Sequence, residues 1–471
     1  MHPHLAAARD RFQLGGWDVL EAAARRGDEL VAAHPGADEV SAAWRHSGEI
    51  LRRGLLFKQA DRPGWRVAAT AFPLPAARMK EIERLGEAAG RFLSAVPTAL
   101  LSGGWLRGFL GFPSWPAEES LLPFASRQPI SFFRLDLTPD RDGRLRLLEM
   151  QTVSGGLGIT AGLRDVYGPH PGLPGIGPAL GEALGAGWRD WCAATGRRAR
   201  EPLRLAALLG SESDFRHEML VLASALPASV RMTLTPWIRL TAPAGVTAAQ
   251  AAEADEGPDA LFRFFQTGRL LTNESAWART LVAQVSAGER CMLNPWIDAL
   301  DDKRLLAAVH REEVGPELGA SVSADDLALL RAAVPPTSVL DAELASRLSN
   351  RPRAERGWYL KKGRSAMSKF VVDGQQVNRG AFDRCLAAAV AEGGWVAQEA
   401  VRGEPWRFRW LDAEAGELRD MDGYVRLMPV FTRKADGSGF RLADLCITAR
   451  PQRSRVHGAS DACLVVPGPG Q

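Results

Sequence analysis

Two short stretches of the sequence combine the hydrophobic residues of buried β-strands with a few regularly spaced polar residues. The stretch ISFFRLDL carries Arg134 and Asp136, and the stretch RLRLLEMQ ends with Glu149 and Gln151. Side chains alternate between the two faces of a strand, so residues two positions apart share a face. The segment PDRDG between the stretches has the composition of a turn, which predicts a β-hairpin with two polar residues on each strand.

The register of this hairpin decides whether the four side chains meet. An even number of unpaired turn residues, such as the six of Thr138–Gly143, places Asp136 and Glu149 on one face, whereas a five-residue turn would separate them. Two ionised carboxylates beside the amide oxygen of Gln151 form a ligand set that suits Mg²⁺. We therefore predict a magnesium site, with Arg134 beside it to neutralise developing phosphoryl charge. On the hairpin alone, a merely solvated polar face is the alternative.

The second half of the sequence supplies cations and backbone donors of the kind that phosphate groups need. Lys361 ends a predicted strand, GWYLK, and a flexible loop containing Gly363, Arg364 and Ser365 follows it. Lys303 opens a predicted helix in LDDKRLLAAV. The pattern predicts a hairpin whose loop closes over a triphosphate.

A further predicted strand, in VAQEAV, ends with Gln398 and Glu399, which can meet a purine and a ribose. Taken singly, these residues and the lysines also have ordinary explanations as solvated or strand-end residues. The sequence has no GxxxxGK[ST] loop, and the loose GxGxxxG of Gly156–Gly162 lacks the acid expected about 20 residues later. Neither a P-loop nor a dinucleotide site is supported.

The surrounding elements alternate between helical and strand patterns, which predicts an α/β (α+β) fold. At 471 residues the chain is about three times a typical domain length, and we expect several regions. We predict a mainly helical N-terminal region (1–125), the region of the polar hairpin (126–200), a small α/β unit (201–300), and a C-terminal region with the lysines, the loop and the last strands (301–471). The tail VVPGPGQ is expected to be disordered.

Composition narrows the functional classes. The chain has 58 Lys and Arg against 55 Asp and Glu, a net charge of +3, which argues against a dedicated nucleic-acid binder. The sequence shows no secretion signal and no apolar run near 18 residues, so we expect a soluble, cytoplasmic protein without a membrane partner. Its five cysteines include no CxxC pair and are read as small buried hydrophobic residues.

Together and in this order, the motifs resemble the circularly permuted branch of the ATP-grasp superfamily, such as the synthetase domain of glutathionylspermidine synthase. That branch begins with a hairpin of the pattern R-x-D, a turn, then E-x-N, which is matched here by Arg134, Asp136, Glu149 and Gln151. The α/β unit, a helix-borne lysine, a strand lysine before a Gly-rich loop, and an adenine hinge follow in the same order across residues 130–401. The departures are Gln in place of the last Asn, TVSGGLG in place of an ADTPT-like run, and a second lysine in place of proline after the strand lysine.

The resemblance implies an ATP-grasp-like fold in circularly permuted order and an ATP-dependent carboxylate–amine ligase. It implies transfer of phosphate from ATP, with Mg²⁺, to a small-molecule or peptidic carboxylate, and displacement of that phosphate by an amine. Arg134 would hold the carboxylate oxygen near the γ-phosphate, while Lys303 and Lys361 offset phosphate charge. A phosphotransferase on the same scaffold and a non-catalytic nucleotide- or partner-binding protein are the alternatives, and a homodimer is allowed.

The acceptor side is less constrained by the sequence. Ser154, Gly155 and Gly156 follow the second strand of the hairpin and can contact substrate through backbone N–H groups, although a plain connector explains them as well. Near the C-terminus, His457 lies in the segment VHGASDA, which is either a loop that returns to the site or an ordinary surface turn.

Overall fold

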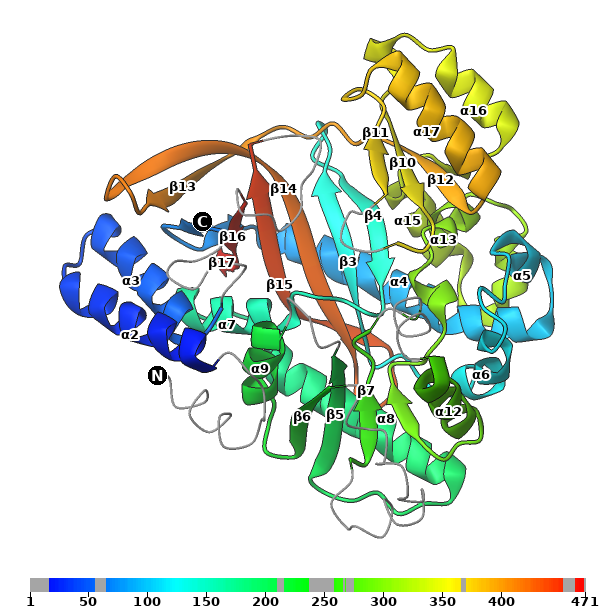
Figure 1. Ribbon diagram of the computed structural model, residues 1–471, viewed down its shortest axis with the longest axis horizontal. Coiled ribbons are helices and arrows are strands. Elements are labelled where there is room, and N and C mark those ends of the chain that lie inside the picture. Colours follow the sequence, from blue (N-terminus) through cyan, green and yellow to red (C-terminus); the bar gives the residue numbers. More distant parts are fainter. Residues whose placement is uncertain are drawn as a thin grey trace.

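The computed structural model describes residues 17–55, 65–209, 216–236, 258–265, 267, 275–365, 370–451 and 462–469. These residues form a large mixed sheet, a small parallel sheet and a third sheet that stands apart as a separate lobe, with helices around all three (Figure 1). The combination confirms the predicted mixed helix and strand class. Within these ranges, no helix combines the length and the apolar character needed to cross a membrane.

The large sheet unites strands from distant parts of the chain. Its neighbours pair antiparallel except β1 and β16, which pair in parallel. In sheet order its strands are β13 (Trp406–Asp412), β1 (Arg66–Ala68), β16 (Cys463–Val465), β15 (Phe440–Arg450), β14 (Glu417–Arg433), β3 (Phe132–Pro139) and β4 (Leu145–Gln151). The strands β3 and β4 are the predicted polar hairpin, and they form one edge of this sheet.

The turn of this hairpin is shorter than predicted. Five residues, Asp140–Arg144, separate the two strands, where the sequence analysis expected six. The side chain of Asp140 accepts a hydrogen bond from the backbone N–H of Arg144 (2.9 Å). Gly143 adopts a φ of 75°, a left-handed conformation that favours glycine. A turn of this length would separate the polar residues if the pairing were regular.

A β-bulge in β4 cancels this effect of the turn. Leu148 is the extra residue, and the register shifts by one position beside it. Beyond the bulge, Asp136 lies opposite Glu149, and Arg134 lies opposite Gln151. The expected meeting of the four side chains is therefore correct, although the expected turn length is wrong.

A long helix, α4 (Ala76–Ser102), lies against the large sheet (Figure 1). Two glycines permit this close approach: a Cβ at Gly86 would lie 1.9 Å from the ring of Phe431, and one at Gly90 would lie 2.2 Å from the ring of Phe440. Both rings belong to the buried core of the sheet. Helix and sheet are therefore closely packed at β14 and β15.

The small parallel sheet has the order β6-β5-β7-β8 and lies at the bottom of Figure 1. It consists of β5 (Leu203–Leu209), β6 (Val230–Pro236), β7 (Ala260–Phe262) and β8 (Cys291–Leu293), with the helices α8 (Ile176–Thr195), α9 (Arg216–Ala225) and α12 (Ser275–Ser286). Directly after β8, the Asn294 side chain donates to the carbonyl oxygens of Phe132 (2.6 Å) and Thr152 (3.1 Å). The carboxyl edge of this sheet is thereby joined to both strands of the polar hairpin.

The third sheet has the order β11-β10-β12-β9 and forms the lobe at the upper right of Figure 1. It contains β9 (Thr337–Val339), β10 (Trp358–Lys362), β11 (Val371–Asp373) and β12 (Trp395–Glu399), covered by α16 (Ala342–Ser349) and α17 (Arg379–Glu392). Leu360 packs in a core with Phe382 of α17, and the side chain of Lys362 pairs with Glu392 on the same helix. Because strand residues alternate, Lys361 between them faces away from these helices.

The remaining elements complete the surroundings of the three sheets. They are α2 (Trp17–Ala33), α3 (Glu39–Arg52), β2 (Phe72–Leu74), α5 (Trp105–Phe109), α6 (Glu118–Ala125), α7 (Leu157–Tyr167), η2 (Asp298–Asp301), α13 (Arg304–Val309), α14 (Val314–Leu318), η3 (Gly319–Ser321), α15 (Ala324–Ala333), η4 (Arg353–Glu355) and β17 (Pro467–Pro469). The expected disorder of the tail is wrong for its described residues, because β17 pairs in parallel with β2. The predicted division of the chain into four regions stays a prediction.

Candidate functional site

Arg134 ties together the polar residues of the hairpin. Its Nε donates to Oδ1 of Asp136 (3.0 Å), its Nη2 donates to Oε1 of Gln151 (2.8 Å), and its Nη1 donates to the carbonyl oxygen of Gly155. Arg134 and Asp136 are both buried, at 8% and 2% exposure. A carboxylate, an amide and a guanidinium thus share one face of the sheet, as the sequence predicts.

A second arginine, Arg426 on β14, completes the surroundings of Asp136. Its Nη1 lies 3.1 Å from Oδ2 of Asp136, so each oxygen of that carboxylate faces a different guanidinium. Its Nε is buried and has no hydrogen-bond partner among the described residues. Burial lowers the pKa of Arg426, and the charge of Asp136 opposes this change. The sequence analysis missed this residue, although a lone charge inside GYVRLMPVF is the signal that marks it.

Lys303 lies beside Glu149, which is on the second strand of the hairpin. Its Nζ lies 2.9 Å from Oε1 of Glu149 and donates to the carbonyl oxygen of Ser365 (2.6 Å). Its backbone N–H donates to the carbonyl oxygen of Gly363 (2.9 Å). Burial raises the pKa of Glu149, but the charges of Lys303, Lys361 and Arg134 outweigh burial and leave this pKa below its usual value. Glu149 is therefore held in its ionised form.

Lys361 reaches the same face from the lobe. Its Nζ donates to Oε1 of Gln398 (2.5 Å) and to the carbonyl oxygen of the bulge residue Leu148 (3.4 Å). Burial lowers the pKa of Lys361 to about 8, assisted by the charges of Lys303 and Arg426 and opposed by those of the two hairpin carboxylates. Gln398, which the sequence analysis assigned to a purine site, is buried and also donates to Thr337 (3.2 Å). In this structure its amide orients Lys361.

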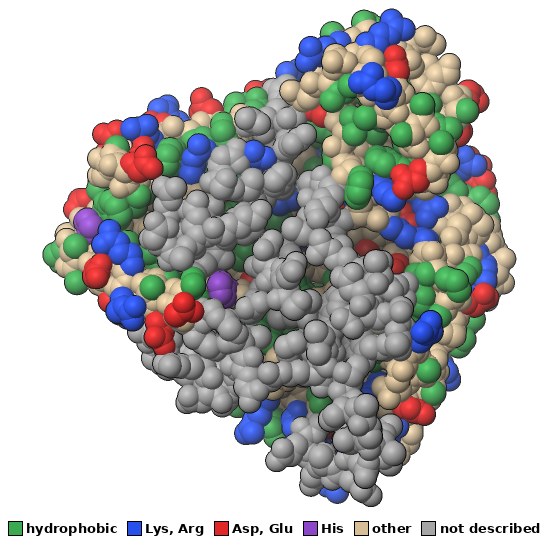
Figure 2. Space-filling model, in the orientation of Figure 1, with side chains coloured by type: hydrophobic (Ala, Val, Ile, Leu, Met, Phe, Trp, Pro, Cys, Tyr) green, Lys and Arg blue, Asp and Glu red, His purple; other side chains and the backbone are tan. Residues whose placement is uncertain are grey.

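The cluster formed by Arg134, Asp136, Glu149, Lys303, Lys361 and Arg426 carries an excess of positive charge. Four cations face two carboxylates, and the two uncharged amides of Gln151 and Gln398 lie among them. Buried charges without counter-charges are costly. An arrangement with two surplus cations is therefore suited to receive an anion with several charges. Figure 2 shows Lys, Arg, Asp and Glu side chains gathered on the surface just below the lobe with α16 and α17.

The other residues that the sequence predicts for the nucleotide site contact neither strand of the hairpin in the hydrogen bonds and ion pairs described below. Arg364 pairs with a carboxylate outside the hairpin, because its Nε lies 2.8 Å from Oδ2 of the buried Asp302. Gly363 fits closely at the same point, since a Cβ there would lie 2.6 Å from Oδ1 of Asp302. The side chain of Glu399 is exposed. His457 lies outside the described residues.

The segment after β4 is partly buried. Ser154 is fully buried, and its Oγ has no hydrogen-bond partner among the residues that the structure describes. Gly156 has a φ of 93° and precedes α7. Behind it, Glu218 of α9 accepts from the backbone N–H of Gly158 (3.3 Å), and burial raises its pKa to about 7. Sequence reasoning missed Glu218, which lies 67 positions beyond Gln151 and meets this segment only in the fold.

The donor set of the hairpin fits a magnesium ion that is shared with phosphate oxygens. Asp136, Glu149 and Gln151 offer hard oxygen atoms on one face, as Mg²⁺ prefers. Each of them now accepts from a basic side chain. Within the described ranges, no group of three or more His, Cys, Asp or Glu residues is placed to hold a metal ion. An ion at this site would need further ligands from a bound molecule.

No protein-family model matches the sequence, and no curated protein matches it. The fold, however, is similar to that of a glutathione synthetase-like effector. The structure of this effector, from Globodera pallida in its apo form, superposes with a TM-score of 0.56 at 11% sequence identity, covering 91% of this chain and 96% of the effector. A putative gamma-glutamylcysteine synthetase from Methylobacillus flagellatus is also similar, with a TM-score of 0.34 at 13% identity over 79% of this chain and 86% of that chain.

The glutathione synthetase-like fold agrees with the ATP-grasp-like architecture that the sequence predicts. The similarity to the effector extends over almost the whole of both chains. At this low identity it shows the fold and not the chemistry.

Proposed function

We propose that this protein is an ATP-dependent carboxylate–amine ligase built as a circularly permuted ATP-grasp enzyme. The order of its parts supports the permutation, because the hairpin β3–β4 precedes the small parallel sheet, which precedes Lys303 and the lobe with Lys361. The name of the similar effector supports a ligase of the peptide-forming kind.

The observation that carries this proposal is the charge of the buried cluster. Four cations converge on two carboxylates, and two positive charges are left over. A triphosphate that brings one magnesium ion carries about two negative charges at neutral pH, so the bound complex would be close to neutral. A site for an uncharged or cationic ligand would have no use for this excess.

Each residue of the cluster has a role in the proposed reaction. Lys303, Lys361 and Arg426 bind phosphate oxygens and offset their charge. Asp136 and Glu149, with Gln151, hold Mg²⁺, which supplies electrostatic stabilisation of the transferred phosphoryl group when bound. Arg134 positions the carboxylate of the first substrate beside the γ-phosphate.

The reaction has two balanced steps. A carboxylate oxygen attacks the γ-phosphorus, the bond between that phosphorus and the β–γ bridging oxygen breaks, and ADP leaves. The amine then attacks the acyl carbon of the acylphosphate, inorganic phosphate leaves, and the amine loses one proton. The chain needs no side-chain nucleophile for either step. Ser154, Gly155 and Gly156 are proposed to contact substrate where the segment leaves β4.

The test incubates the protein with ATP, Mg²⁺ and pools of carboxylates and amines, and follows phosphate release and the masses of new products. ADP together with a condensed product supports the ligase. A stable phosphorylated product would show a phosphotransferase instead, and nucleotide binding without turnover would show a non-catalytic protein. The Glu149→Gln variant should lose magnesium-dependent turnover, whereas Asp444→Asn, which alters a buried carboxylate on β15, should retain it.

A further inference from the structure

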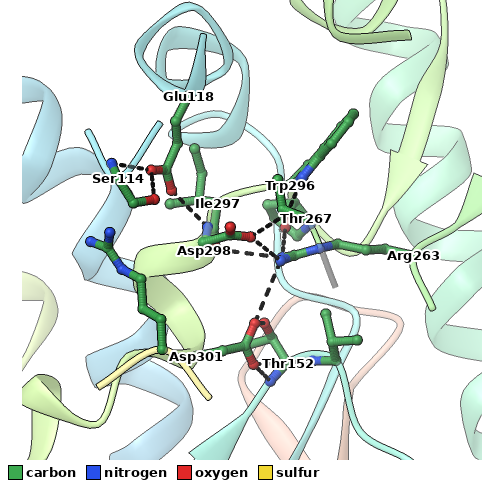
Figure 3. Close-up of polar contacts among 12 residues, drawn as sticks. Ser114, Glu118, Thr152, Arg263, Thr267, Trp296, Ile297, Asp298 and Asp301 are labelled. Atoms are coloured by element: carbon green, nitrogen blue, oxygen red, sulfur yellow. Dashed lines mark hydrogen bonds and ion pairs between the residues drawn. The ribbon is translucent and has the colours of Figure 1, made fainter. Parts of the chain in front are cut away.

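Asp301 binds the backbone where the chain leaves β4 (Figure 3). Its Oδ1 accepts from the backbone N–H groups of Thr152 (2.5 Å) and Val153 (3.1 Å), and its Oδ2 accepts from the hydroxyl of Thr152 (3.0 Å). These two residues directly follow Gln151, the last residue of the hairpin strand. One carboxylate therefore accepts from two consecutive backbone N–H groups just beyond the end of β4.

Asp301 is itself fixed by a buried polar network that Figure 3 displays. Nη2 of Arg263, a fully buried residue just after β7, lies 3.6 Å from Oδ2 of Asp301 and 2.8 Å from Oδ1 of Asp298. Oδ1 of Asp298 also accepts from the hydroxyl of Thr267 (2.6 Å). The backbone N–H of Asp298 donates to the side chain of Glu118 on α6 (2.8 Å). The network connects the small parallel sheet and α6 with the end of β4.

The segment that carries Asp301 also carries Lys303, and both attach to the same strand. Asp301 binds the backbone just after β4, while Lys303 binds Glu149 two residues before the end of β4. Lys303 in turn binds the backbone of Gly363 and Ser365 at the end of β10. Two attachment points fix one segment relative to a strand much more firmly than a single ion pair.

We propose that Asp301 is a positioning residue that holds Lys303 in place beside Glu149 of the hairpin and so sets the affinity for MgATP. This inference rests on the proposed function, because it assigns Lys303 to the phosphates. Asp301 acts through the backbone of Thr152 and Val153 and does not itself contact the ligand. Its effect should appear in nucleotide binding even when no substrate pair is known.

The test measures binding of MgATP to the full chain by titration calorimetry, for Asp301→Ala and for the matched control Asp298→Ala. Both variants remove one carboxylate from Arg263, but only Asp301 contacts the end of β4. Alanine is needed at both positions, because an asparagine at 301 would keep an oxygen that accepts from the backbone of Thr152 and Val153. We expect Asp301→Ala to weaken MgATP binding at least tenfold and Asp298→Ala to change it less than twofold. Equal effects of the two variants on binding would show a merely structural role and overturn the proposal.

Two further variants test the route through Lys303. If Asp301 acts by placing Lys303, then adding Asp301→Ala to Lys303→Met should weaken binding less than threefold further, whereas full additivity of the two losses would refute the route. Thr152→Val removes one hydrogen bond to Asp301 with little change of shape, and an expected loss of about threefold in affinity provides the test if Asp301→Ala does not fold. An unchanged affinity in Thr152→Val would then count against the proposal.

The same titration separates the two hypotheses. A wild-type protein that binds no MgATP refutes the proposed function and this inference with it. A wild-type protein that binds MgATP, together with an Asp301→Ala variant of unchanged affinity, refutes this inference alone.

Discussion

Replacing Lys361 by methionine should make the protein more stable and its nucleotide binding weaker. Burial lowers the pKa of Lys361 from its ordinary value of 10.5 to about 8. At about 1.4 kcal/mol for each pKa unit, carrying the charged lysine costs the folded state about 3 kcal/mol at neutral pH. Met has a similar length and no charge, so this cost disappears in the variant.

Part of the gain is lost again, because Lys361 donates to the buried Gln398. Leaving that amide oxygen without its partner costs about 1–3 kcal/mol. We therefore expect Lys361→Met to raise the free energy of unfolding at pH 7 by roughly 1 kcal/mol.

The sign of the pH dependence follows from the lowered pKa. The cost is fully present below pH 8 and vanishes as the pH rises from 8 to 10.5, because the unfolded lysine then loses its proton as well. The difference in free energy of unfolding between Lys361→Met and wild type should therefore shift by about 1.4 kcal/mol in favour of wild type between pH 7 and pH 9. Thermal unfolding of both proteins at these two pH values measures this convergence.

Nucleotide binding should change in the opposite direction. A lost hydrogen bond between a cation and a phosphate costs about 2 kcal/mol, or roughly 30-fold in affinity for MgATP. Lys362→Met is the matched control, because this neighbouring lysine pairs with Glu392 on the helix side of β10. A Lys361→Met variant that bound MgATP as tightly as Lys362→Met does would refute the assignment of Lys361 to the phosphates.

Two further predictions concern residues that surround the hairpin. Arg426→Gln removes a buried charge from beside Asp136 and should weaken MgATP binding roughly tenfold, while the exposed Arg419→Gln on the same strand should leave it unchanged in the same titration. For Glu218, the folded pKa of about 7 exceeds the ordinary 4.5, so a cost of about 3 kcal/mol develops as the pH rises from 4.5 through 7. The melting temperature of Glu218→Gln should therefore exceed that of wild type by a margin that grows between pH 5 and pH 8. A margin that stays the same over this pH range would contradict the raised pKa of Glu218.

The hairpin shows how far local patterns lead. Alternation of polar and apolar residues identified both strands and predicted that Asp136 and Glu149 share a face. The turn length was wrong, and the correct outcome depends on the bulge at Leu148, which no local pattern announces. In the folded protein the carbonyl oxygen of the bulge residue Leu148 accepts from Lys361, 213 positions further along the chain. A partner at this distance in the sequence cannot be read from any local pattern.

The residues that sequence reasoning missed are those that reach the site only through the assembled sheets. Arg426 comes from a strand that pairs with β3, and Asp301 comes from a short helix beside the end of β4. Neither belongs to a motif with recognisable spacing. Lys303 and Lys361 were found because each begins or ends an element that the sequence predicts, and such ends lie where chains meet ligands. Arg364 illustrates the converse, since its pairing with Asp302 could not be read from a flexible, basic loop.

The ion pairs of the cluster also constrain how a ligand enters. Each proposed magnesium ligand already accepts from a cation: Asp136 from two arginines, Glu149 from Lys303, and Gln151 from Arg134. Magnesium alone would have to compete with these cations and would raise the positive charge of the cluster further. A triphosphate alone would draw the same cations away and leave the carboxylates facing its negative charge. When magnesium and the triphosphate bind together, the basic side chains pair with phosphate oxygens and the carboxylates bind the metal. Binding of magnesium and binding of the nucleotide should therefore each strengthen the other.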